Sequence, residues 1–167
     1  PQVESGPTGV HLSPDKKYVL TADVFNGKIY KSSIETNSTE ILYSHEYGVN
    51  TARQDTTGAV WFTQSTENQN EERVFEALER AIPDGALYRI RGSGSEMTPE
   101  LVIDGLYFAN GFYIDERSSK FYLSEMMKNR VLVFDLDLAT GKLSNQTTLA
   151  SIPTPDNMEL NLSLIHI

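Results

Sequence analysis

The sequence contains no cysteine, and this absence excludes several kinds of protein. Without cysteine the chain can form no disulfide scaffold, no zinc–thiolate centre and no cysteine nucleophile. The chain is also poor in positive charge, with 14 basic residues against 23 acidic ones and a formal net charge of −9 at pH 7. Nucleic acids and anionic membranes attract positive charge, so we expect neither as a partner. No apolar run approaches the ~20 residues that a membrane-spanning helix needs.

What remains is the composition of a globular chain. Its 167 residues are 39% hydrophobic and 22% charged, which is typical of one folded domain or of part of one. The chain begins at Pro1 rather than at a methionine, so we leave open an earlier segment, and with it the compartment. The last residues, 162–167, break the pattern of everything before them. We expect them to be a translated sequencing adaptor, with a genuine terminal strand as the alternative, and we assign His166 no role.

Short alternating segments recur along the chain. They are rich in Val, Ile, Tyr and Phe and are separated by Gly, Asp, Asn and Ser, which is typical of short strands joined by turns. Three such stretches, 6–46, 47–104 and 105–152, can be superposed, and a fourth begins at 153–161. A repeat of about 40 to 50 residues with four strands is typical of a β-propeller blade. The sequence therefore predicts an all-β chain of about three blades, fewer than the roughly four to eight that close a ring.

One segment departs from the strand pattern. Within 70–82 the apolar residues have the spacing of one face of a helix, and Pro83 and Gly85 follow it. We therefore predict one short inserted helix near 70–82. Its charged residues form a solvated face or, as an alternative, the helix serves as a lid over the functional end of the propeller.

Polar residues recur where the innermost strand of each predicted blade begins. In a propeller these positions surround the mouth of the central channel, although they are far apart in sequence. This register holds Thr8, Asn50, Asn110 and Asp156, with Asn157 next in the chain. Amide and carboxylate oxygens suit a hard cation, calcium above all. Any one of these residues is explained as well by a turn, but their recurrence at one register favours a site.

Other conspicuous side chains are better explained by structure. His11 falls within a predicted inner strand, and we expect a packed or hydrogen-bonded channel-wall residue there rather than a catalytic one. His11 and His45 are isolated from each other, so we predict no zinc site. We expect the aromatic residues to form the core between blades, namely Trp61, Phe62, Phe112, Tyr113, Phe121 and Tyr122.

A series of short motifs follows in a specific order along the chain. It includes Tyr-Phe-Ala-Asn-Gly at 107–111, Phe-Tyr-Leu-Ser-Glu at 121–125 and Pro-Asp-Asn at 155–157. Their order and spacing resemble the gluconolactonase, senescence-marker protein and luciferin-regenerating enzyme family, whose layout strictosidine-synthase-like proteins and paraoxonases share. The resemblance covers nearly all of 6–161. It implies a six-bladed propeller, of which this chain forms about half, with a catalytic calcium in its channel.

The resemblance also implies roles for single residues. Asn110 and Asp156 match two of the family's metal ligands, and Asn157 stands where paraoxonase-like members carry another. Asn50 matches an asparagine near the metal that binds substrate, and Asp156 matches the carboxylate that acts as general base. The family's remaining ligand is a glutamate in the first blade, which we expect upstream of this chain. The implied activity is calcium-dependent hydrolysis of a sugar lactone or related ester, with another divalent cation as an alternative.

Two other functional classes stay open. A propeller of this kind can bind a ligand or a protein without catalysis, because a fold does not determine a function. A strictosidine-synthase-like condensing enzyme would need no metal. We also expect the 167-residue chain alone to be inactive and prone to aggregate, because three blades leave two sheet faces exposed. The identity of the substrate and the oligomeric state do not follow from the sequence.

Overall fold

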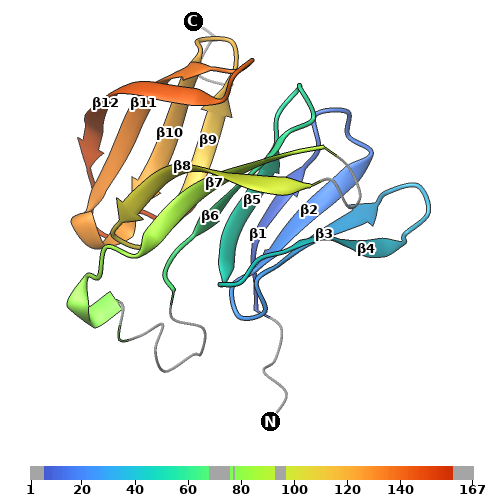
Figure 1. Cartoon of the computed structure of the whole chain (residues 1–167), viewed down its shortest axis with the longest axis horizontal. Helices are drawn as coiled ribbons and strands as arrows, with labels where there is room; N and C mark the ends of the chain where they lie inside the picture. Colours follow the sequence, from blue (N-terminus) through green and yellow to red (C-terminus); the bar gives the residue numbers. More distant parts are fainter. Residues whose placement is uncertain (1–5, 68–75, 77, 93–96, 160–167) are drawn as a thin grey trace, which may run out of the picture.

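A computed structural model shows the chain folded into three four-stranded antiparallel sheets that follow one another along the sequence (Figure 1). The structure describes residues 6–67, 76, 78–92 and 97–159. In each sheet the strands are neighbours in chain order, so each sheet is a simple meander. The first strands of the three sheets lie side by side. The predicted all-β fold is confirmed.

The strands are short and have the following bounds. The first sheet contains β1 (Pro7–Leu12), β2 (Tyr18–Asp23), β3 (Lys28–Ser33) and β4 (Thr39–Ser44). The second contains β5 (Val49–Gln54), β6 (Val60–Gln64), β7 (Gly85–Arg91) and β8 (Thr98–Leu106). The third contains β9 (Ala109–Asp115), β10 (Lys120–Glu125), β11 (Arg130–Asp137) and β12 (Lys142–Ser151). A short 3-10 helix, η2 (Met126–Lys128), joins β10 to β11.

Aspartate side chains stabilise many of the turns between these strands. In each case the carboxylate accepts a hydrogen bond from the backbone N–H two residues later, an arrangement that holds the chain in a turn and competes with strand pairing. The aspartates with this contact are Asp15, Asp23, Asp55, Asp115 and Asp137. The turn residues that punctuate the sequence therefore act locally, which explains why the strand pattern is visible without tertiary information.

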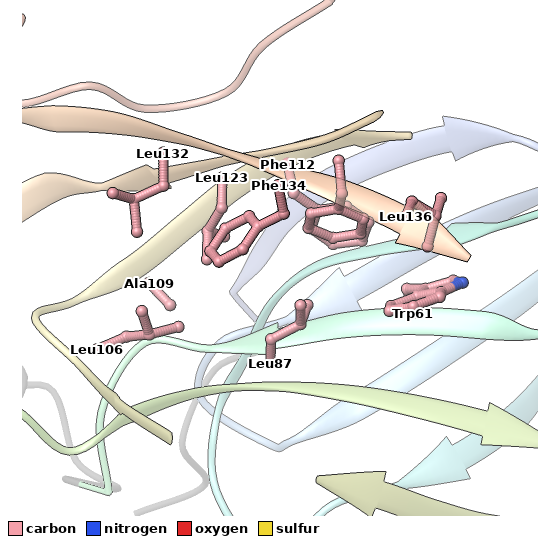
Figure 2. Close-up of a cluster of buried hydrophobic side chains, with 10 residues drawn as sticks. Trp61, Leu87, Leu106, Ala109, Phe112, Leu123, Leu132, Phe134 and Leu136 are labelled. Carbon is pink, nitrogen blue, oxygen red and sulfur yellow. The ribbon is translucent and has the colours of Figure 1, made fainter. Parts of the chain in front are cut away.

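An apolar core joins the second sheet to the third (Figure 2). Trp61 of β6 lies against Phe121 of β10, with ring centroids 5.2 Å apart, and Phe112 of β9 stacks on Phe121 at the same distance. Burying one large apolar side chain contributes about 1.5 to 3 kcal/mol to folding. Figure 2 also shows Leu87, Leu106, Ala109, Leu123, Leu132, Phe134 and Leu136 in this cluster.

A separate core joins the second sheet to the first. Val60 and Phe62 flank Trp61 in β6 and point to the opposite face, where they meet the first sheet. Successive side chains of a strand alternate between its faces, so β6 contributes to both cores. The other buried members are Leu20, Ala22, Ile29, Val49, Ala52 and Ile90.

The structure confirms four of the six predicted core aromatics. Trp61, Phe62, Phe112 and Phe121 are fully buried between sheets. Tyr113 and Tyr122 differ because each neighbours one of these residues along its strand and therefore points to the other face. Both are half-buried there, in a hollow of about 360 Å³ that is also lined by Val131, Leu149 and Met158.

A buried ion pair of the second sheet connects that sheet to the third through its arginine. Asp55, at the turn after β5, accepts a hydrogen bond from the Trp61 indole N–H at 2.8 Å and pairs with the Arg89 guanidinium at 3.3 Å. Arg89 also donates to the backbone carbonyl of Leu138, in the turn after β11, at 2.8 Å. The Asp55 and Arg89 side chains are buried, so the charge of each is compensated inside the protein.

The predicted helix near 70–82 is described only in part. Residues 76 and 78–80 are helical, with Arg80 paired to Glu76 one turn earlier at 2.8 Å, and Ala81 ends the segment with a left-handed φ of 49°. The other residues predicted to begin this helix, and residues 162–167, lie outside the described part. Over the described ranges, no helix is long and apolar enough to cross a membrane.

Candidate functional site

The predicted register residues lie where the first strand of each sheet begins. Thr8 is in β1, Asn50 in β5 and Asn110 in β9, whereas Asp156 and Asn157 lie in the non-strand segment that follows β12. The Thr8 hydroxyl donates a hydrogen bond to the backbone carbonyl oxygen of Asn50 at 2.6 Å. Thr8, which matches no metal ligand, therefore ties β1 to β5.

Asn50 and Asn157 meet at one hydroxyl group. Thr51 Oγ1 lies 3.1 Å from Asn50 Oδ1 and 3.3 Å from Asn157 Oδ1, although Asn157 is 106 residues further along the chain. A hydroxyl has one proton, so it can donate to only one of these amide oxygens at a time. The arrangement therefore leaves acceptor capacity on two oxygens that point to the same place.

Asn110 has a buried acceptor without a partner. Its side-chain nitrogen lies 3.5 Å from Met126 Sδ, and Asn110 Oδ1 has no hydrogen bond with the described residues. Thr63 Oγ1 donates to the Asn110 backbone carbonyl at 2.9 Å, which fixes the start of β9 against β6. An unpaired buried acceptor is destabilising by about 1–3 kcal/mol, and in a native protein it calls for an explanation such as a bound ion.

The segment with Asp156 and Asn157 packs directly on β9. A Cβ atom placed on Gly111 would lie 2.6 Å from Asn157 Cα and 2.8 Å from the Asp156 carbonyl oxygen. This close approach requires glycine and places the segment beside Asn110. The Asp156 side chain is exposed and makes no hydrogen bond with the described residues. The structure thus brings Asn50 and Asn157 to one hydroxyl and places the segment of Asp156 beside Asn110.

The donor set fits a hard cation better than a soft one. The described residues contain no cluster of three or more His, Asp or Glu side chains that could bind a metal. The candidate site instead offers three amide oxygens, from Asn50, Asn110 and Asn157, and one carboxylate, from Asp156. Calcium takes about six to eight oxygen ligands and accepts amide oxygens readily. The unpaired Asn110 oxygen and these donors fit calcium in kind, and a complete shell needs further ligands.

A second layer of polar residues lies further along β1, β5, β9 and the segment that follows β12. Arg53 Nη2 donates to Glu159 Oε1 at 2.5 Å and to the Met158 carbonyl oxygen at 2.9 Å, and the Arg53 guanidinium lies 5.4 Å from the centre of the Tyr113 ring. His11 Nδ1 is 3.5 Å from Glu159 Oε1. We call these four side chains the second layer: His11, Arg53, Tyr113 and Glu159.

The sequence analysis missed Arg53 and Glu159 as site residues. The signal that identifies them is a constant offset, because each member of the second layer lies three residues after a register residue. His11 follows Thr8, Arg53 follows Asn50, Tyr113 follows Asn110 and Glu159 follows Asp156 at this spacing.

The two histidines among the described residues, His11 and His45, both have pKa values lowered by burial. Burial, and then the charge of Arg53, lower the pKa of His11 to about 4, so its imidazole is neutral at pH 7. His11 lies in β1 with 10% of its side chain exposed. His45 Nε2 pairs with Gln64 Oε1 at 2.9 Å, and its ring lies among Phe62 and Tyr88. Burial lowers the pKa of His45 as well.

The chain is similar to known proteins in sequence and in fold. A family model described as SMP-30/Gluconolactonase/LRE-like region matches residues 42–160. A gluconolactonase structure from Xanthomonas campestris is similar, with a TM-score of 0.67 and 16% identity, over 90% of this chain and 51% of that one. A luciferin-regenerating enzyme is similar with a TM-score of 0.54 and 14% identity, over 87% of this chain and 61% of that one. At these identities the structural likeness shows the fold alone.

A curated relative is also similar over part of the chain. It is the cell growth-regulated gene 1 protein of Candida albicans, which is 26% identical over 93 residues, or 49% of this chain and 27% of that protein. The chain therefore spans about a quarter of this relative and between half and three-fifths of the two solved structures.

Proposed function

The chain belongs to the SMP-30/gluconolactonase/LRE-like family, and from this premise we propose that it contributes part of the active site of a calcium-dependent hydrolase of sugar lactones or related esters. The family and the gluconolactonase-like fold support a hydrolase of the lactonase type. The observation that carries the calcium proposal is the buried Asn110 Oδ1, which has no hydrogen-bond partner among the described residues and lies beside the segment of Asp156 and Asn157.

Asn110, Asp156 and Asn157 are the residues that would hold the metal. Bound calcium would supply electrophilic polarisation of the lactone carbonyl. The chain's own residues would then do the rest of the chemistry. Asn50, buried at the start of β5, would orient the substrate through its side-chain amide. Asp156 is exposed, so its carboxylate is accessible to a water molecule.

The proposed reaction is a hydrolysis with one proton transfer in each direction. Asp156 would accept a proton from water while the water oxygen forms a bond to the carbonyl carbon. The ring C–O bond would then break, and the departing alkoxide would take the proton back from Asp156. The product of lactone hydrolysis is a single hydroxy acid. The carboxylate of Asp156 is regenerated.

The test is hydrolysis of gluconolactone by the protein expressed from its complete gene. Proton release at pH 7 should depend on added calcium, should stop with EDTA and should return when calcium is restored. Asp156→Asn should lower kcat by about 10² to 10⁴, the usual contribution of a general base. Glu40→Ala, an exposed change in β4, is the control and should leave kcat unchanged.

Two outcomes would contradict the proposal and identify the alternative class. Calcium binding without hydrolysis of any lactone or ester would indicate a non-catalytic binding propeller. Turnover that EDTA does not change would indicate metal-free chemistry, as in a condensing enzyme of the strictosidine-synthase-like type.

A further inference from the structure

The second layer contains an ion pair that the proposed reaction does not use. Arg53 is mostly buried, with 14% of its side chain exposed, whereas its partner Glu159 is 66% exposed. The pair spans 106 residues of sequence and joins β5 to the segment that follows β12. An exposed carboxylate on a non-strand segment can be hydrated by water instead of forming an ion pair. Its pairing with this one arginine therefore needs a structural explanation.

We propose that Arg53, acting through Glu159 and the Met158 carbonyl, is the positioning residue that holds Asp156 and Asn157 against β9 and thereby completes the cation site. This inference rests on the proposed function, because it concerns the assembly of the same site. It assigns to Arg53 no contact with metal or substrate.

The hydrogen bonds of the segment support this role. Its start is fixed to the end of η2, because the N–H groups of Ile152 and Thr154 donate to Asn129 at 2.9 Å each. Beyond Thr154, the hydrogen bonds of the described residues that hold the segment come from Thr51 and Arg53, and both lie on β5. Asp156 and Asn157 belong to no strand, so these side chains replace the backbone pairing that a strand would have.

The chemistry of arginine suits this task. Its planar guanidinium has several donors in a fixed fork, so Arg53 can bind a carboxylate and a backbone carbonyl together. Nη2 takes the Met158 carbonyl and one Glu159 oxygen, and Nη1 lies 3.4 Å from the other Glu159 oxygen. Charge-assisted hydrogen bonds of this kind are about twice as strong as neutral ones. A lysine at this position would keep the charge but lose the fork.

The surroundings of Arg53 restrict where its guanidinium can lie. The Tyr113 ring is 5.4 Å away on β9, and the neutral His11 ring lies on β1 near the same Glu159 oxygen. The first strands of all three sheets therefore meet the segment at the second layer. This layer lies three residues further along each element than the register residues. Groups that orient metal ligands without touching the metal affect its affinity by about 10- to 100-fold when they are removed.

The first measurement is calorimetric titration of CaCl2 into the protein expressed from its complete gene. Glu159→Ala and Arg53→Lys should each weaken calcium binding about tenfold. The double variant should be no weaker than Arg53→Lys, because Glu159 acts only through Arg53 and its loss adds nothing once the arginine fork is gone. Glu40→Ala is the matched control, since Glu40 is 69% exposed and pairs with Lys31, and it should leave the affinity unchanged.

The second measurement needs no metal. Glutamyl endopeptidase in EDTA cleaves after accessible glutamates, and mass spectrometry identifies each site. In Arg53→Lys, cleavage after Glu159 should accelerate about tenfold relative to cleavage after Glu40, because the segment opens locally when the charge-assisted bonds are lost. An unchanged ratio would overturn the inference, as would full calcium affinity in Glu159→Ala.

The two proposals fail in different ways. If the wild-type protein binds no calcium, the proposed hydrolase and the metal-site part of this inference fall, while the cleavage ratio still decides whether Arg53 holds the segment. If the wild type binds calcium and hydrolyses lactone but both variants match it, the proposed function stands and the positioning role of Arg53 is wrong.

Discussion

Asp55 and Asn110 are both buried polar residues, but they differ in how many of their side-chain oxygens have hydrogen-bond partners. Asp55 accepts hydrogen bonds from a backbone turn, from the Trp61 indole and from Arg89, so its charge is fully compensated. Asn110 is also buried, with 4% exposure, yet its side-chain oxygen Oδ1 has no hydrogen-bond partner within the described residues. A satisfied group stabilises the fold, whereas an unsatisfied one calls for an explanation such as a bound ion.

At this scale, the first prediction concerns Asp55. Asp55→Asn should lower the free energy of unfolding by about 3–5 kcal/mol, because it leaves the buried Arg89 without a countercharge. Urea unfolding of the protein expressed from its complete gene, followed by circular dichroism, measures the change. Asp135→Asn removes an exposed pair with Lys120 and is the control, for which little change is expected. Equal stability of the two variants would contradict a structural role for the buried pair.

The second residue-scale prediction concerns His11 and pH. Its pKa is about 4 in the folded protein and about 6.5 when unfolded, so the unfolded state binds the extra proton between these values. The contribution of neutral His11 to the free energy of unfolding is therefore fully present above pH 6.5. It is lost as the pH falls towards 4, and its size is about 3 kcal/mol. His11→Gln should remove that part of the pH dependence, which urea unfolding at pH 7, 5.5 and 4 would show. An identical pH profile for the variant would contradict the assignment.

At the scale of elements, two glycines allow the first strands to approach their neighbours. A Cβ on Gly9 of β1 would lie 2.9 Å from the Asn50 carbonyl oxygen and from Thr51 Cα of β5. Gly111 of β9 meets the backbone of Asp156 and Asn157 in the same way. Each glycine directly follows a register residue, so the polar register and the close approach of the elements belong to one arrangement.

This arrangement predicts the effect of Gly111→Ala. The added methyl group would overlap backbone atoms, which cannot rotate away, so the segment of Asp156 and Asn157 must move off β9. We expect calcium binding to weaken at least about tenfold while the protein stays folded. Calorimetric titration measures the affinity, and circular dichroism reports the fold. Thr147→Ala, an exposed change on β12 of the same sheet, is the control, and an unchanged affinity in Gly111→Ala would contradict the prediction.

At the scale of the whole molecule, apolar side chains remain exposed on the three described sheets. Val10 and Leu12 of β1 are 61% and 52% exposed, and Leu149 of β12 is 58% exposed. Leu149 belongs to the apolar hollow on the third sheet that Tyr113 and Tyr122 also line. Contiguous exposed apolar surface is uncommon on isolated soluble domains and promotes association.

We therefore predict that the 167-residue chain, expressed alone, self-associates and hydrolyses no lactone. Size-exclusion chromatography with light scattering should show oligomers or aggregates, because association covers the exposed apolar faces. Leu149→Lys with Leu12→Lys should shift the distribution towards monomer. A monomeric wild-type chain with calcium-dependent turnover would contradict the prediction.

The sequence by itself determined the strands, the turns and the register of polar residues, because all three depend on local chemistry. Alternation of apolar residues marks strands, and aspartates bind the backbone two residues on, so neither needs a distant partner. The repeat then placed Asn50, Asn110 and Asp156 at equivalent positions. The roles of these residues as ligands, substrate contact and base stay predictions.

Only the tertiary structure decided which of these residues meet. Thr8 and Asn110 occupy the same register, yet Thr8 is bound to the β5 backbone while Asn110 Oδ1 is left unpaired. Arg53 and Glu159 are 106 residues apart, and Tyr113 faces away from the core that Phe112 joins. Such contacts depend on how whole sheets pack against one another, and a local sequence pattern does not determine that packing.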